Sequence, residues 1–116
     1  MSDHESLVRN HMKLLAAGDV DAIMSDFAGD AVMAAFGREY EGTDAIRGFF
    51  GKTIERTAPG ATYEIQSLDV QGDEVEITWN LLVPGGDAPV ASGGDRFWIE
   101  DGNFVRQSVW VGPKPE

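Results

Sequence analysis

Two kinds of hydrophobic periodicity divide the sequence near residue 62. Before that point apolar side chains recur every three or four residues, as on one face of a helix, in three segments. The first covers residues 2–18, the second is shorter and is capped by Asp19, and the third covers 43–59, with Thr43 as its cap. Residues 31–36 are predicted to form a short strand. The first half of the chain therefore predicts three helices and one strand.

After residue 62 apolar and polar side chains alternate, which is the period of a β-strand. We expect three long strands there, joined by turns at 72–73, around 84–86 and at 101–102. The alternation changes phase near Gln66-Ser67, where a β-bulge would absorb the slip and bend the sheet. Helices followed by an antiparallel meander are typical of an α+β fold. We predict one domain over residues 1–116, with three N-terminal helices packed on a curved antiparallel sheet around a cone-shaped pocket.

The composition limits the kinds of partner. The chain carries 20 acidic and 9 basic residues, a net charge of −11, and no cysteine. This excess of negative charge repels phosphate backbones and anionic lipid, so we expect neither nucleic acid nor a membrane as a partner. We also expect no cofactor and no metal, because no acidic residue stands at ligand spacing from His4 or His11. The N-terminal residues lack a basic and apolar leader, which makes the cytoplasm the expected location.

Two titratable side chains are predicted to face the pocket. Asp95 shares strand parity with Phe97 and Ile99, and burial there would raise its pKa into a range suited to acid–base chemistry. The alternative is that a turn at Gly93-Gly94 leaves Asp95 solvated at the pocket mouth. His11 lies on the apolar face of the first helix, either as a proton-transfer group or as a core histidine with one hydrogen-bond partner.

The remaining pocket residues are predicted from their positions along the chain. Tyr40, in the loop before the third helix, and Gln107, inward on the last strand, could hydrogen-bond a ligand. The alternatives are that the tyrosine ring packs at the base of the loop and that the glutamine bridges an ordered water. The apolar wall and core are expected to include Phe36, Phe49, Phe50, Trp79 and Phe97.

Three segments resemble the nuclear transport factor two-like superfamily, which includes SnoaL-like polyketide cyclases and ketosteroid isomerases. They are 14–21 (LLAAGDVD), 27–32 (FAGDAV) and 41–50 (EGTDAIRGFF), and the resemblance covers nearly the whole chain. It implies the cystatin-like roll of that superfamily and a pocket for a small apolar molecule, cyclic or polyketide-like. Each segment serves a cap, a turn or a packing face, so the resemblance is specific for fold and not for function.

The isomerase branch looks closest in layout. Its oxyanion tyrosine falls on His11, its second oxyanion donor, an aspartic acid, falls on Asp95, and its proton-shuttling carboxylate falls on Ala35. Because alanine cannot carry a proton, the resemblance does not extend to steroid isomerisation. The epoxide-hydrolase branch is also disfavoured, because its Asp and Arg act together, whereas Asp95 and Arg96 point to opposite faces of one strand.

The outer face of the predicted sheet carries two tryptophans. Trp98 and Trp110 share parity with Arg96 and Arg106, so both rings would face solvent in a monomer. Members of the superfamily usually dimerise through this face, which implies a homodimer here. The alternative is that the two arginines screen the rings.

Two functions remain open on the sequence. The first is an isomerase- or cyclase-like enzyme for a small apolar ligand, with Asp95 as acid and base and His11 as hydrogen-bond donor. The second is a non-catalytic ligand-binding or dimerisation module, which the missing carboxylate at Ala35 favours.

Overall fold

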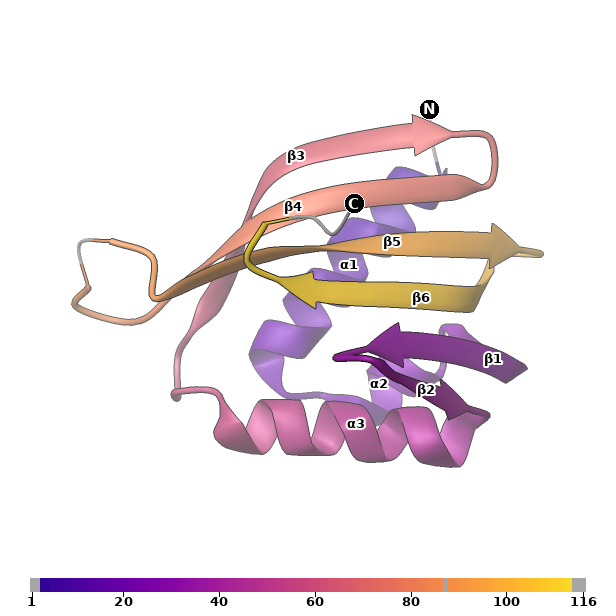
Figure 1. Cartoon of the computed structure of the whole chain (residues 1–116), viewed down its shortest axis with the longest axis horizontal. Helices are drawn as coiled ribbons and strands as arrows, with labels where there is room; N and C mark the ends of the chain where they lie inside the picture. The colour runs from indigo at the N-terminus through magenta and orange to yellow at the C-terminus, as the bar shows by residue number, and fades with distance from the viewer. Residues whose placement is uncertain (1–2, 87, 114–116) are drawn as a thin grey trace.

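Helices cover one side of a single sheet in the computed structural model, which describes residues 3–86 and 88–113 (Figure 1). None of the described helices is long and apolar enough to cross a membrane. The sheet has six strands in the order β2-β1-β6-β5-β4-β3. The elements are α1 (Asp3–Ala17), α2 (Val20–Met24), β1 (Phe27–Ala35), β2 (Arg38–Glu41), α3 (Thr43–Arg56), β3 (Thr62–Gln71), β4 (Glu74–Leu82), β5 (Ala91–Glu100) and β6 (Asn103–Val111).

The predicted α+β class is confirmed, with a mixed sheet in place of a wholly antiparallel one. β1 runs parallel to β6, while every other neighbouring pair is antiparallel. The two parallel strands are far apart in sequence. Parallel pairing requires a long connection, and the chain between β1 and β6 is long enough to provide it. The three predicted turns also separate four strands, β3 to β6, where we expected three.

The predicted N-terminal cap is correct for α2 and wrong for α3. The Asp19 carboxylate accepts a hydrogen bond of 3.1 Å from the backbone N–H of Ala22, which confirms it as the cap of α2. For α3 the cap is Gly42, and Thr43 is the first helical residue. Gly42 has φ 85°, a conformation that costs a residue with a side chain more than it costs glycine. Ser2, expected to start α1, lies outside the described residues.

The predicted β-bulge is present and lies in a visibly bent part of the sheet. The register of β3 against β4 shifts between Ile65 and Ser67, and Figure 1 shows both strands curving around the helices. A bulge increases local bend and twist because one residue is left unpaired. The concave side and the helices enclose a core of buried apolar side chains, which includes Val8, Ile23, Phe27, Met33, Ile46, Ile77, Phe97 and Phe104.

Two adjacent glycines in β5 let a tryptophan lie on each face of the strand. A Cβ at Gly93 would be 2.9 Å from Cζ2 of Trp79, on the pocket side. A Cβ at Gly94 would meet the Trp110 ring on the outer side and would be 2.6 Å from the backbone oxygen of Ile77. Both glycines are buried inside the strand. The predicted alternative of a turn at Gly93-Gly94 is therefore wrong. The two glycines instead leave room for the Trp79 and Trp110 rings, one on each face of β5.

We predict that Gly94→Ala lowers the free energy of unfolding by about 1–3 kcal/mol, because the added methyl group meets backbone that cannot move aside. Urea denaturation measures this. Gly48→Ala is the matched control, since a Cβ there has no atom within 4 Å, and in a helix this change should stabilise by up to about 1 kcal/mol. Equal stability of the two variants would contradict the close packing described at Gly94.

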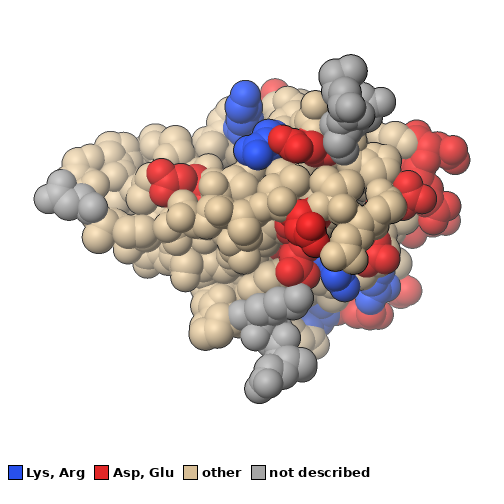
Figure 2. Space-filling view, turned by 90° about the horizontal axis from the view of Figure 1, so that it is seen from above, with Lys and Arg blue, Asp and Glu red and all other residues tan. Residues whose placement is uncertain are grey.

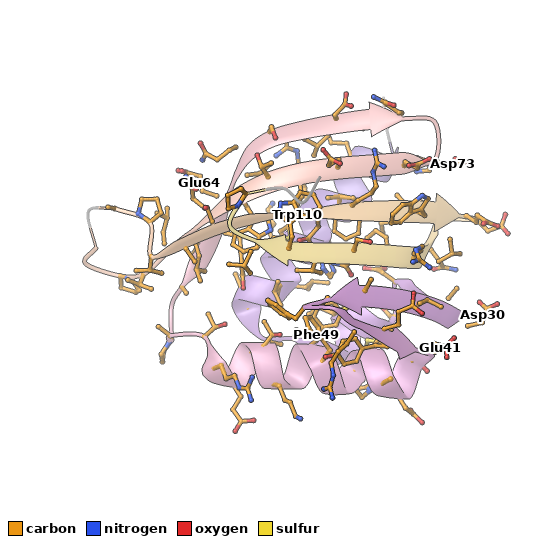
Figure 3. All side chains as sticks on the ribbon, in the orientation of Figure 1. Asp30, Glu41, Phe49, Glu64, Asp73 and Trp110 are labelled. Atoms are coloured by element: carbon orange, nitrogen blue, oxygen red, sulfur yellow. The ribbon has the colours of Figure 1, made fainter. Side chains whose placement is uncertain are left out.

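The two outer-face tryptophans have different surroundings. The guanidinium carbons of Arg96 and Arg106 lie 5.8 Å and 5.7 Å from the ring centroid of Trp98, so arginines screen this ring on the outer face. Trp110, on the near face in Figure 3, lies over Gly94, and none of the described arginines lies over its ring. Any apolar contact with a second chain would therefore centre on β6.

We predict that the wild type scatters light as a dimer and Trp110→Glu as a monomer, because a carboxylate at the centre of the interface would lose its hydration. Trp110→Phe is the control that keeps an apolar ring and should stay dimeric. Circular dichroism checks that the glutamate variant is folded. A wild type with the mass of one chain would end the proposal of a dimer.

Candidate functional site

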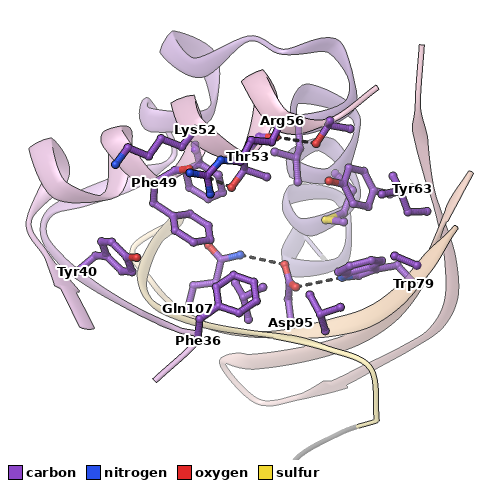
Figure 4. A pocket seen from close by; sticks show the side chains of 18 of the residues that line it. Phe36, Tyr40, Phe49, Lys52, Thr53, Arg56, Tyr63, Trp79, Asp95 and Gln107 are labelled. Carbon is purple, nitrogen blue, oxygen red and sulfur yellow. Dashed lines mark hydrogen bonds between the residues drawn. The ribbon is translucent and has the colours of Figure 1, made fainter. Parts of the chain in front are cut away.

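A cavity of about 560 Å³ lies between α3 and the concave face of the sheet (Figure 4). Its volume falls within the range of pockets that hold small organic molecules. Most of the lining is apolar, and the exposed side chain of Phe36 marks the mouth. The apolar lining residues include Met12, Leu15, Phe36, Phe49, Phe50, Trp79, Leu81, Val109 and Val111.

Asp95 projects from β5 into this cavity, and its carboxyl group is held by two neutral donors. Trp79 Nε1 donates to Oδ1 over 3.1 Å and Gln107 Nε2 donates to Oδ2 over 2.9 Å (Figure 4). The side chain is 3% exposed. Burial raises the pKa of Asp95 to about 6, even though the two hydrogen bonds act in the opposite direction. The carboxyl group can therefore both accept and donate a proton near neutral pH.

Two other polar side chains of the lining lie next to Asp95 and Trp79. Gln107 Oε1 is buried and has no hydrogen-bond partner among the described residues, so it is available to a donor on a ligand. Tyr63 packs its ring edge-on against Trp79, with 5.1 Å between centroids. Burial raises the pKa of Tyr63, a side-chain hydrogen bond with Thr57 acts in the opposite direction, and the nearby charge of Asp95 raises the pKa further.

His11 lies outside the cavity. It is fully buried and has ring-centroid distances of 5.3–6.1 Å to four phenylalanines. Neither ring nitrogen has a hydrogen-bond partner among the described residues, and burial lowers the pKa of His11 to about 4. The histidine is therefore a neutral core residue without the single partner that we expected. One of its ring neighbours, Phe97, is likewise absent from the cavity lining.

The other predicted site residues line the cavity, though their roles toward a ligand stay predictions. Tyr40 does so from strand β2, where we expected a loop, and its ring lies 5.1 Å from that of Phe49. The turn before β2 is formed by Phe36 and Gly37, both with positive φ, which pairs β1 with β2 as a hairpin. The side chains that meet at the cavity are Asp95, Gln107, Tyr40, Phe36, Phe50 and Trp79.

Sequence reasoning missed several polar lining residues. They are Arg38 on β2, Lys52, Thr53 and Arg56 on α3, Thr57 at the C-cap of α3, and Tyr63 on β3. Helical spacing could have identified those on α3, because residues three, four and seven positions after Phe49 share its face. Among the described residues, no group of three or more His, Cys, Asp or Glu side chains is arranged to hold a metal ion.

Comparisons with known proteins agree on the fold. A family model described as a SnoaL-like domain matches residues 8–107. A proposed polyketide cyclase from Sinorhizobium meliloti superposes with a TM-score of 0.76 at 21% identity, covering 95% of this chain and 100% of that one. A proposed isomerase of the SnoaL-like family from Agrobacterium tumefaciens gives 0.80 at 18% identity, covering 97% and 100%.

A third solved structure carries no assigned function. It is a protein with a cystatin-like fold from Nostoc punctiforme, with a TM-score of 0.77, 18% identity and coverage of 94% and 88%. None of the curated proteins has a sequence that matches this chain significantly. At these identities the likeness establishes the cystatin-like fold and no more.

We predict that His11→Leu changes how stability depends on pH. A histidine with a pKa lowered from 6.5 to about 4 stabilises the folded state fully above pH 6.5, and this contribution is lost as the pH falls toward 4. The loss amounts to about 3 kcal/mol between pH 7 and pH 4. Urea unfolding of His11→Leu should therefore diverge from the wild type by about that amount toward acid.

Substitution of Asp95 should change the pH dependence of stability in the opposite direction. Its raised pKa makes a contribution that is present below pH 3.8 and is lost as the pH rises through about 6. Asp95→Asn should thus diverge from the wild type with the opposite sign. Parallel profiles for wild type and His11→Leu would contradict the account of His11 as a neutral, unpartnered side chain.

Proposed function

This chain belongs to the family of SnoaL-like domains, and we propose that its cavity binds a small, mainly apolar molecule, cyclic or polyketide-like, for acid–base chemistry of the isomerase or cyclase type. The observation that carries the proposal is the buried carboxyl group of Asp95 in an otherwise largely apolar cavity. A proposed polyketide cyclase and a proposed isomerase among the similar structures support the same class of ligand.

In the proposed reaction Asp95 is the proton carrier. At pH 7 a group with a pKa near 6 is mostly ionised, so it can accept a proton from a carbon next to a carbonyl group. The neutral carboxyl group then returns this proton to another carbon of the same ligand, which leaves Asp95 as it began. Trp79 and Gln107 fix the two oxygens through their N–H groups, so the carboxylate needs little reorganisation during transfer.

The other cavity groups would orient the ligand. Stacking on Phe36 and Phe49, whose ring centroids are 6.4 Å apart, suits a flat apolar ring. The protonated hydroxyl of Tyr63 is a neutral donor for the oxygen on which charge develops. Gln107 Oε1 would accept a hydrogen bond from a hydroxyl group of the ligand.

A non-catalytic ligand-binding module is the second candidate. Ala35 is 3% exposed on β1, where the isomerase branch carries its proton-shuttling carboxylate. His11 lies in the core and is not part of the lining. Among the described lining residues, Asp95 is the one acidic side chain. Chemistry that needs two separate proton-transfer groups is thereby disfavoured, and binding without turnover would use the same cavity.

We predict that the wild type incorporates deuterium from D₂O into the α-carbons of cyclic ketones and β-dicarbonyl compounds, and that Asp95→Asn lowers this rate at least about 100-fold. The rate should rise with pH through about 6 as Asp95 ionises. Mass spectrometry across a panel of such compounds measures it, and near-ultraviolet circular dichroism checks the fold.

The outcomes separate the two candidates. Exchange in Asp95→Asn at the wild-type rate would reject Asp95 as the proton carrier. Binding without exchange in the wild type would favour the non-catalytic module. Ser67→Ala is the control, because this residue lies on a bulge in β3 outside the cavity lining and should leave exchange unchanged.

A further inference from the structure

Unpaired positive charge collects at the cavity. Four arginines, on α1, α3, β5 and β6, form ion pairs with Asp or Glu. Lys13, Arg38, Lys52 and Arg56 form no ion pair with any described residue. All except Lys13 line the cavity. In a chain with 20 acidic and 9 basic residues, three unpaired cations at one opening need a physical reason.

Two of these cations are placed so that their charges repel each other. Lys52 and Arg56 are separated by one turn of α3, where like charges repel. Arg38 is an exposed residue of β2, which packs beside α3. In Figure 4, Lys52 and Arg56 belong to the helix above the cavity, whereas Asp95 comes from the sheet below it. Lys52 and Arg56 therefore lie on the side of the cavity away from the carboxyl group.

Acidic side chains gather elsewhere on the molecule. Figure 2 shows Asp and Glu concentrated at the end opposite the β4–β5 connection. Figure 3 labels Asp30, Glu41 and Asp73 at that same end, and Glu64 toward the other. Among the described residues, Asp95 is the one acidic side chain that lines the cavity, so a ligand can supply the negative charge that Arg38, Lys52 and Arg56 lack there.

We propose that the ligand is an amphipathic organic anion, whose apolar body fills the cavity and whose anionic group is bound at the mouth by Arg38, Lys52 and Arg56. This rests on the proposed function, since it assigns a substrate class to the same cavity. Charge determines the orientation of the ligand, because an anionic group placed next to ionised Asp95 would be repelled. The anionic group therefore stays at the mouth, and the part of the ligand that reacts lies at Asp95.

Two fluorescent probes with the same ring system test the proposal. One is 1-anilinonaphthalene-8-sulfonate, which is anionic, and the other is N-phenyl-1-naphthylamine, which lacks the sulfonate. The wild type should bind the anion more tightly, and added salt should weaken only this probe. The affinity for the anionic probe should fall about two- to fivefold in each of Arg38→Gln, Lys52→Gln and Arg56→Gln. In the triple variant it should fall at least about tenfold.

The neutral probe and a fifth variant, Lys13→Gln, serve as controls. All four proteins should bind N-phenyl-1-naphthylamine as the wild type does, which excludes a collapsed cavity. Lys13→Gln removes an unpaired cation outside the lining and should change neither affinity. Calorimetric stoichiometry of one probe per chain identifies a single site.

The results distinguish failure of this proposal from failure of the proposed function. Equal affinity for both probes, or an effect of the three substitutions no larger than that of Lys13→Gln, would overturn the anion site while leaving the apolar cavity intact as a binding site. Binding of neither probe would overturn both proposals.

Discussion

The site depends on the burial of one carboxyl group in a largely apolar cavity. Removing Asp95 from water favours its neutral form, and the two groups that hold it, Trp79 and Gln107, are uncharged donors that only partly offset this cost. A nearby cation would have kept the carboxylate fully ionised and weakly basic. The protein instead places its unpaired cations at the opening, so the carboxyl group keeps a pKa close to neutrality.

The architecture explains how such a group stays buried. The bulge between Ile65 and Ser67 bends β3 and β4, and the bend leaves space between the sheet and α3 that side chains do not fill. Gly93 admits the Trp79 ring beside Asp95, so the donor is fixed by packing and not by a flexible loop. The same sheet that forms the core thus positions the reactive group, and the cost of its burial is met by the stability of the whole domain.

The sequence predicted the parts that depend on short-range periodicity. Alternation placed Asp95, Gln107 and Trp79 on one face, and a phase slip located the bulge. It could not predict the parallel pairing of β1 with β6, because no local pattern records which distant strands become neighbours. The helical position of His11 left it facing either the pocket or the core, because the apolar face of α1 is wide enough to serve both. The cations at the mouth were missed because the sequence does not show which exposed basic residues lack an acidic partner.

The most direct test of this account is the titration of the Asp95 carboxyl carbon, followed by carbon-13 NMR and assigned by comparison with Asp95→Asn. A buried carboxyl group held only by neutral donors should titrate with a midpoint of about 6. A midpoint near the ordinary value of 3.8 would mean that water reaches the carboxylate freely, and it would contradict the central claim.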